Sequence, residues 1–283
     1  MLKCSHTKAY HTSRAVSARQ PRWFGRTQLF VTGVAATVTM LAGCGIAQSP
    51  RGELAENQRI LASCDPSAPP ASLVEIDGTG SSASESITTE RMAAVESIVR
   101  RTAVCSGYLR VIVFSSSSAA TSVLFDGPLR MHGATENARL KRVPSVVADV
   151  MQQIQQDYGP AVAGLPGGGS DITAQYRLAA EWIGQLGGSY QLHLTILTDG
   201  CQNISVDLCS RPLSKQEVTG LAGQVTVPQL PGASVTVAGL GRVAGTPPSS
   251  QVAEQLIMYF DAVCAQTAAA KCVSVTDYAT EGR

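Results

Sequence analysis

From residue 71 onward, short apolar runs alternate with longer segments in which apolar residues recur every three to four positions. The short runs predict strands, and the longer segments predict helices that pack on a sheet. Strands that alternate with helices are typical of a parallel sheet with helices on its faces. The predicted strands are 73–76, 109–114, 121–125, 191–197, 234–240 and 272–275, and the predicted helices are 86–101, 145–158, 171–187 and 249–270.

This order of elements predicts one α/β domain, with a doubly wound, mainly parallel central sheet flanked by helices. The nearly continuous apolar run 109–114 fits a central strand covered on both faces, whereas 121–125, followed by Asp-Gly-Pro, predicts an edge strand. Residues 131–142 have no clear pattern, and the glycine-rich stretch 159–169 predicts a loop. In doubly wound sheets ligands bind outside the carboxyl ends of the strands, so residues that follow strands are candidate site residues.

The first 43 residues have the pattern of an export signal. A stretch with basic but no acidic residues precedes the apolar run 29–42, which is too short to span a bilayer comfortably. The run leads into Leu41-Ala42-Gly43-Cys44, which resembles a bacterial lipobox. We therefore expect residues 1–43 to be a lipoprotein signal peptide and Cys44 to carry a lipid anchor on the extracytoplasmic face of the cell membrane. The alternative is an uncleaved signal anchor.

Residues 44–70 follow this signal and are rich in Pro and Ser, with a short helix possible only over 54–61. This composition predicts a flexible tether between the lipid-anchored Cys44 and a domain over residues 71–283.

Net charge excludes one class of partner. Six of the 22 Lys and Arg residues precede Cys44, while all 21 Asp and Glu residues follow it, so residues 44–283 carry a net charge of −5. Proteins that bind nucleic acid usually present an excess of basic residues. We therefore expect no nucleic-acid partner.

Six cysteines remain once Cys44 is assigned to lipid, and an even number in an exported chain predicts disulfides. Six cysteines allow 15 pairings. Short sequence separation favours Cys201–Cys209 and Cys264–Cys272, which leaves Cys64–Cys105. A zinc site is the weaker alternative, because the chain has no Cys-x-x-Cys motif. A Cys201–Cys209 bridge would either stiffen the loop after Asp199 or act as a plain loop staple.

Oxygen-bearing side chains follow the strand 73–76. Asp77, Thr79 and Ser81 are spaced two residues apart, and Gly78 and Gly80 allow a tight turn in which their oxygens converge. Hard oxygen ligands suit Mg²⁺, Mn²⁺ or Ca²⁺ better than a soft-ligand metal. Alone, this spacing also fits a plain loop with a helix N-cap.

Two further motifs occur in a fitting order. A glycine-rich loop leads to Ser170, and the apolar strand 191–197 ends in Thr198-Asp199-Gly200. With Asp77-x-Thr79-x-Ser81, the set resembles the metal-ion-dependent adhesion site of the von Willebrand factor type A family. The family has Ser where this chain has Thr79 and Thr where it has Ser170, and both exchanges keep a hydroxyl. The resemblance covers roughly residues 70–265 and implies the Rossmann-like fold predicted above.

The resemblance implies a divalent cation, Mg²⁺ before Mn²⁺ or Ca²⁺, held by Asp77, Thr79, Ser81, Ser170 and Asp199. It also implies a protein ligand that offers an Asp or Glu to the cation, so that the chain is a membrane-tethered binding module rather than an enzyme. Two alternatives remain: a structural envelope lipoprotein with a vestigial site, and a metal-dependent hydrolase. The hydrolase is disfavoured because the chain lacks Gly-x-Ser-x-Gly and His-Glu-x-x-His motifs.

Overall fold

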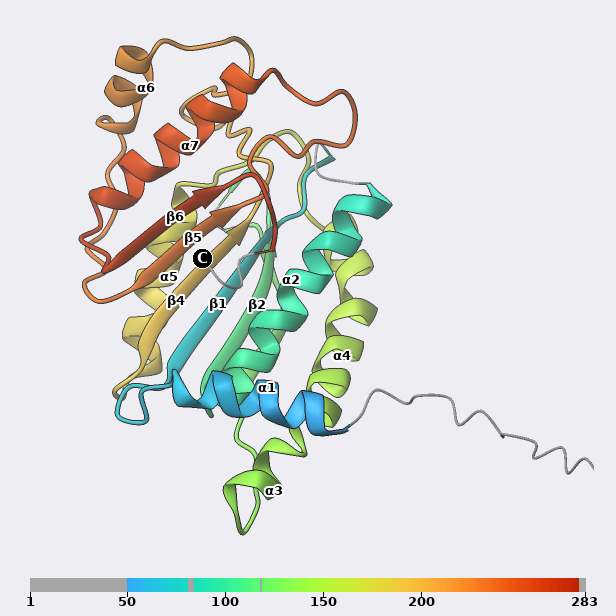
Figure 1. Ribbon diagram of the computed structural model, residues 1–283. Helices are drawn as coiled ribbons and strands as arrows, with labels where there is room; N and C mark the ends of the chain where they lie inside the picture. The colour runs from blue at the N-terminus through green and yellow to red at the C-terminus, as the bar shows by residue number, and fades with distance from the viewer. Residues whose placement is uncertain (1–49, 81–83, 118, 280–283) are drawn as a thin grey trace, which may run out of the picture. The chain divides into compact units, whose positions relative to one another are not determined.

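The computed structural model describes residues 50–80, 84–117 and 119–279. They lie in a compact unit that the chain forms from Ala47 onward. Its centre is a six-stranded sheet of order β3-β2-β1-β4-β5-β6, in which β3 runs antiparallel to β2 and all other neighbours are parallel (Figure 1). The predicted α/β fold class, with a mainly parallel sheet flanked by helices, is confirmed.

The strands and helices alternate as the sequence pattern predicts. The strands are β1 (Pro70–Asp77), β2 (Tyr108–Phe114), β3 (Thr121–Pro128), β4 (Gln191–Leu197), β5 (Ser234–Ala238) and β6 (Lys271–Val275). The helices are α1 (Pro50–Ala62), α2 (Glu85–Val104), α3 (Glu136–Leu140), α4 (Val143–Ala163), α5 (Ala174–Leu186), α6 (Lys215–Ala222) and α7 (Ser250–Ala265).

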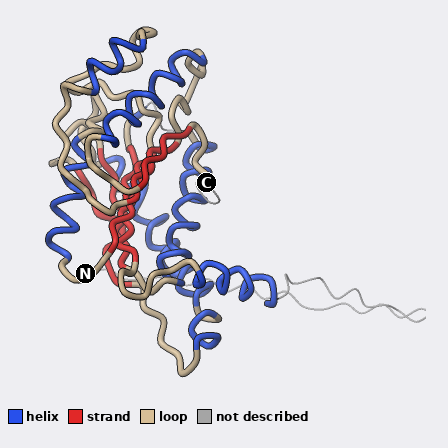
Figure 2. Tube along the Cα trace, turned by 60° about the vertical axis from the view of Figure 1, so that its left-hand side comes forward, coloured by secondary structure: helices blue, strands red, loops and turns tan. Residues whose placement is uncertain are grey.

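Two hydrophobic cores cover the two faces of the sheet. On one face, Leu73, Leu194 and Val235 pack with α5, α6 and α7. On the other, Val74 and Val111 pack with α2 and α4. Figure 2 shows the sheet edge-on between these helical layers. Strand β1 contributes buried side chains to both cores and lies in the interior of the sheet, between β2 and β4.

One half of the second face has no described helix over it. Figure 1 looks directly onto β4, β5 and β6 there, with α2 to one side and α1 below the lower ends of the strands. The sequence explains this opening. In β4, Leu192, Leu194 and Ile196 enter the first core, while His193 and Thr195 point to the opposite face. Alternation of this kind gives the strand one apolar and one polar face.

The segment before β1 differs from its prediction. Residues 50–70 fall within the predicted flexible tether, but α1 packs against α2 and α3, and its Ile60 is part of the second core. Cys64, just after α1, forms a disulfide with Cys105 at the end of α2. This stretch is therefore part of the domain, while residues 44–49 of the tether lie outside the described residues.

The three predicted disulfides are confirmed. Cys64–Cys105 closes a sequence separation of 41 residues, and Cys201–Cys209 and Cys264–Cys272 each close a separation of 8.

Two stretches differ from the predicted elements. Helix α4 continues through Pro160 to Ala163, in a stretch predicted as loop; Pro160 stands in the last turn, and its carbonyl oxygen accepts the hydrogen bond of Gly164 N. Helix α6 was not predicted at all. It begins with a capping box in which Ser214 Oγ accepts from Glu217 N and the Glu217 carboxylate accepts from Ser214 N.

Candidate metal centre

The carboxylate of Asp77 is the centre of a cluster of hydroxyl groups at the carboxyl end of β1. The residue is fully buried. Its Oδ1 accepts hydrogen bonds from Thr79 N at 3.0 Å and from Thr79 Oγ1 at 2.7 Å. The tight turn expected after β1 therefore forms and directs the Thr79 hydroxyl back to the acid.

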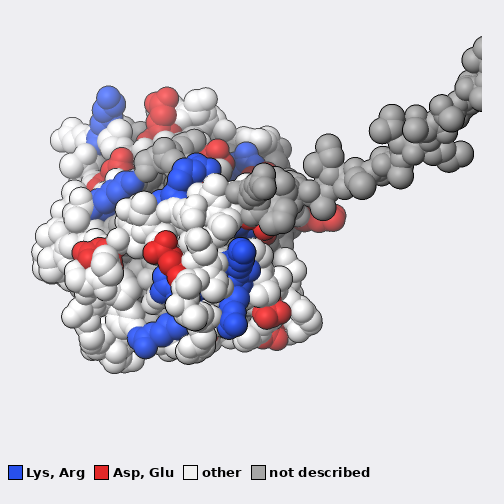
Figure 3. Space-filling view, turned by 60° about the horizontal axis from the view of Figure 1, so that its bottom comes forward, with Lys and Arg blue, Asp and Glu red and all other residues white. Residues whose placement is uncertain are grey.

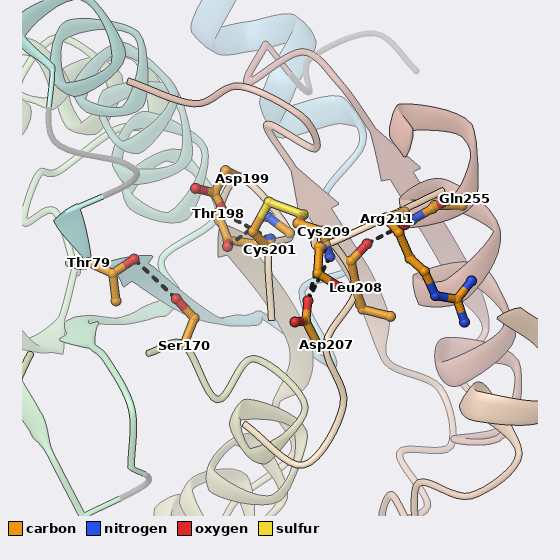
Figure 4. The surroundings of a disulfide bond; sticks show 12 residues. Thr79, Ser170, Thr198, Asp199, Cys201, Asp207, Leu208, Cys209, Arg211 and Gln255 are labelled. Atoms are coloured by element: carbon orange, nitrogen blue, oxygen red, sulfur yellow. Dashed lines mark hydrogen bonds between the residues drawn. A yellow bond between two sulfur atoms is a disulfide. The ribbon is translucent and has the colours of Figure 1, made fainter. Parts of the chain in front are cut away.

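Ser170 reaches the same carboxylate from the loop before α5, 93 residues further along the chain. Its Oγ lies 3.1 Å from Asp77 Oδ2 and 3.3 Å from Asp77 Oδ1. It also lies 3.1 Å from Thr79 Oγ1, the contact drawn in Figure 4. Ser170 is 3% exposed. Three of the five predicted ligands, Asp77, Thr79 and Ser170, are thus within hydrogen-bond distance of one another.

Thr198 is a site residue that the sequence analysis missed. Its Oγ1 donates to Asp77 Oδ2 at 2.7 Å and accepts from Gly200 N at 3.0 Å. The cause is strand register: β1 and β4 are parallel neighbours with Ile76 beside Leu197, so the next residue on β4 lies beside Asp77. One sequence feature could have indicated Thr198: it lies between the end of the strand and Asp199, at the same edge of the sheet as Asp77. The motif match identified Asp199 alone and therefore missed Thr198.

Asp199 follows Thr198 and is also fully buried. Its Oδ1 accepts from Cys201 N at 2.8 Å, and its backbone oxygen accepts from Gly241 N at 2.8 Å, so both ends of the residue are fixed. Figure 4 shows its carboxylate on the same side of β4 as the Thr79–Ser170 pair. Ser81, the fifth predicted ligand, lies outside the described residues, as does the predicted lipid-anchor residue Cys44.

The loop that carries Ser170 is held by the loop that follows Asp199. Asn203 Oδ1 accepts from Ser170 N at 2.9 Å, and Gln202 Oε1 accepts from Thr173 N at 2.9 Å. The Gln202 amide also donates to Thr173 Oγ1 at 3.1 Å. The fully buried Gln202 therefore joins the two loops, and the Cys201–Cys209 disulfide closes the loop from which it comes.

The chemistry of this cluster fits a hard divalent cation. Asp77 and Asp199 are two buried acids, and the hydrogen-bond donors to the Asp77 carboxylate described above are neutral hydroxyl and amide groups. Buried carboxylates are costly unless their charge is balanced. Among the described residues, no group of three or more His, Cys, Asp or Glu side chains suits a metal ion. A cation here would thus take hydroxyl oxygens as protein ligands beside the two carboxylates, a set that suits Mg²⁺ or Mn²⁺ rather than zinc.

The surface seen in Figure 3 carries basic and acidic side chains that are interspersed rather than gathered by sign. This face offers no extended basic patch of the kind that binds nucleic acid. Within the described part of the chain, every helix is too short or too polar to cross a membrane.

No model of a known protein family matches the chain, and no curated protein matches it in sequence. Solved structures share its arrangement weakly. BatB from Bacteroides thetaiotaomicron is 10% identical, with a TM-score of 0.42 over 73% of this chain and 89% of that chain. An aerotolerance-related membrane protein from Bacteroides fragilis is 12% identical, with a TM-score of 0.40 over 73% of this chain and 90% of that chain. Manganese-loaded TRAP protein from Plasmodium vivax is 15% identical, with a TM-score of 0.36 over 67% of this chain and 63% of that chain. Similarities of this size carry no information about function.

Proposed function

We propose that the chain is a binding module that captures a partner protein through a divalent cation held at the Asp77 cluster. The supporting observation is the convergence of Thr79, Ser170 and Thr198, from three separate segments, on the one buried carboxylate of Asp77. A plain loop or a helix cap would need only the local contact to Thr79. In this proposal Asp77, Thr79, Ser81, Ser170 and Asp199 hold the cation, and Thr198 orients the Asp77 carboxylate.

The charge of the site determines the kind of partner. The five proposed protein ligands leave at least one coordination position of a six-coordinate divalent cation open, and a hard cation prefers an oxygen ligand there, above all an anionic one. An Asp or Glu side chain of a partner protein supplies such an oxygen. The proposal includes the lipid anchor at Cys44, which would keep the module on the extracytoplasmic face of the membrane.

Cation binding is tested by isothermal titration of Mg²⁺, Mn²⁺ and Ca²⁺ into residues 47–283. We expect saturable binding of at least one cation, lost in Asp77→Asn and weakened in Ser170→Ala. Asn keeps the shape of Asp77 but removes the charge that attracts the cation. The matched control is Ser145→Ala, because the Ser145 hydroxyl is exposed and contacts only Arg142 O in the first turn of α4.

The outcomes separate the alternatives. Binding that is lost in Asp77→Asn and retained in Ser145→Ala supports the proposal, and partner capture that a chelator abolishes would extend it to the protein ligand. No binding by the wild type would favour the structural lipoprotein with a vestigial site. Cation-dependent turnover of ester or phosphoester substrates, lost in Asp77→Asn, would favour the hydrolase.

A further inference from the structure

A groove of about 510 Å³ lies over the uncovered half of the sheet, between α1, α2 and strands β4 to β6. This volume is in the range of small-molecule sites. The groove is remote from the Asp77 cluster. His193 in its floor lies beside Ser72 of β1, five residues before Asp77. At about 3.3 Å per residue this places the two sites roughly 16 Å apart along the strand.

Basic side chains from three elements line this groove. They are Arg101 of α2, His193 of β4 and Lys271 of β6. Burial lowers the pKa of His193, and the positive charges of Arg101 and Lys271 lower it further. Arg101 and Lys271 therefore each lie close enough to His193 to disfavour its charged form. Among the described residues of the lining, the acidic side chain is that of Glu56, which forms an ion pair with Arg59.

Hydroxyl groups make up much of the remaining lining. Ser97 Oγ is shielded from solvent and has no hydrogen-bond partner in the described structure. A shielded hydroxyl without a partner costs free energy unless a ligand or water satisfies it. The other hydroxyl-bearing residues of the lining are Ser72, Thr195, Ser234 and Thr236.

We propose that this groove binds a small soluble phosphate ester of a sugar or other polyol. A phosphate monoester carries a charge of roughly −1.5 to −2 near pH 7, which matches two permanent cations better than a single carboxylate does. The hydroxyl groups of the floor suit a ligand body rich in hydroxyls rather than an apolar one. The concentration of positive charge is notable because residues 44–283 are net acidic.

The test is isothermal titration of sn-glycerol 3-phosphate into residues 47–283, with glycerol and sodium sulfate as comparison titrants. We expect saturable binding that glycerol does not show and sulfate shows more weakly. Lys271→Gln and Arg101→Gln should each weaken it at least about fivefold, because each removes a charge-assisted contact. Lys215→Gln, an exposed lysine on α6, is the matched control and should change the affinity less than about twofold.

A second readout follows His193 by NMR. Bound phosphate should raise the pKa of its imidazole, because a negative charge offsets Arg101 and Lys271, the cations that face it, while Glu56 stays paired with Arg59. The proposal is overturned by no saturable binding at millimolar concentrations, by binding that Lys271→Gln and Arg101→Gln leave unchanged, or by sulfate binding as tightly as the phosphate ester. Binding to phosphatidylglycerol vesicles without binding of the soluble ester would also overturn it, in favour of a membrane surface.

Discussion

Arg91 donates a hydrogen bond of 2.7 Å from Nη1 to the backbone carbonyl oxygen of Asp77. Its Nε donates to the phenolic oxygen of Tyr278 at 3.1 Å, and its guanidinium carbon lies 5.3 Å from the centre of the Tyr278 ring. Arg91 is fully buried and Tyr278 is 1% exposed. Arg91 therefore ties the backbone at the candidate metal centre to the segment that follows β6.

Tyr278→Phe is expected to lower the free energy of unfolding by about 2 kcal/mol. Hydrogen bonds to charged groups contribute about 1.5–3 kcal/mol, and the change leaves Arg91 Nε buried without an acceptor. Urea unfolding of residues 47–283 measures the effect. Tyr158→Phe is the matched control, because the half-buried Tyr158 hydroxyl makes no hydrogen bond to another described residue, and its cost should stay below about 0.5 kcal/mol. Equal costs for the two variants would mean that the Arg91 contact is not stabilising.

Gly239→Ala is expected to destabilise the fold by about 2–5 kcal/mol. Gly239 has a φ of +94°, and a Cβ there would lie 2.1 Å from Cε1 of Tyr278. The variant thus adds overpacking, which costs about 1–3 kcal/mol, to the strain of a left-handed alanine, about 1–2 kcal/mol. Gly232→Ala separates the cost of overpacking from the cost of backbone strain, because Gly232 has a φ of +78° but open space around it. Thermal unfolding should show the smaller loss for Gly232→Ala, and similar losses would contradict the packing argument.

The sequence indicates where the candidate metal centre lies better than it indicates all of the residues that take part in it. Two apolar runs that end in Asp77 and Asp199 are sufficient to place both acids at the same edge of a parallel sheet. The role of Thr198 depends on the register between β1 and β4, which places Thr198 next to Asp77. The contact of Arg91 with the Asp77 carbonyl depends on how α2 packs. The pattern of residues along the chain indicates neither the strand register nor this packing.

The open half of the sheet could have been predicted but was not. Residues 191–197 and 234–238 alternate between apolar and polar side chains, whereas a strand covered on both faces is apolar throughout. The fold-class prediction, a doubly wound sheet flanked by helices, did not specify which strands the helices cover. Helix α6 was missed for a different reason: it has only 8 residues, so its main signal is the Ser214–Glu217 capping box.

Glu75 is expected to make stability fall as pH rises. It is fully buried on β1, and neither carboxylate oxygen has a hydrogen-bond partner in the described structure. Burial raises its pKa well above the ordinary value of 4.5, although Arg110 opposes the shift. Above pH 4.5 the unfolded chain loses this proton while the folded chain keeps it, so folding loses free energy until the folded pKa is reached.

Glu75→Gln should remove this pH dependence, because an amide does not titrate. Its gain in free energy of unfolding over the wild type at pH 8 should come from this lost deprotonation step, about 1.4 kcal/mol for each pH unit between 4.5 and the folded pKa. At pH 4 the variant and the wild type should differ little, because Glu75 is protonated in both states. Urea unfolding at several pH values measures the difference. Glu181→Gln is a control, since Glu181 is exposed and also lines the small cavity beside Glu75. A constant difference between Glu75→Gln and wild type across pH would contradict the assignment.

The Cys201–Cys209 disulfide is expected to affect cation binding as well as stability. Cys201 N donates to Asp199 Oδ1, and Cys209 N donates to Asp207 Oδ1 at 3.1 Å, so the bridge closes a loop that begins at the candidate metal centre (Figure 4).

Cys264–Cys272 is an ideal comparison because it closes the same sequence separation of 8 residues, from α7 to β6. Loop-closure entropy predicts a loss of about 2–3 kcal/mol when either pair is replaced by serine. Only the Cys201→Ser, Cys209→Ser variant should also weaken cation binding in the calorimeter, because only that loop positions Asp199 and, through Asn203, the backbone of Ser170. If both double variants lose stability and neither loses cation affinity, the first disulfide is a plain loop staple.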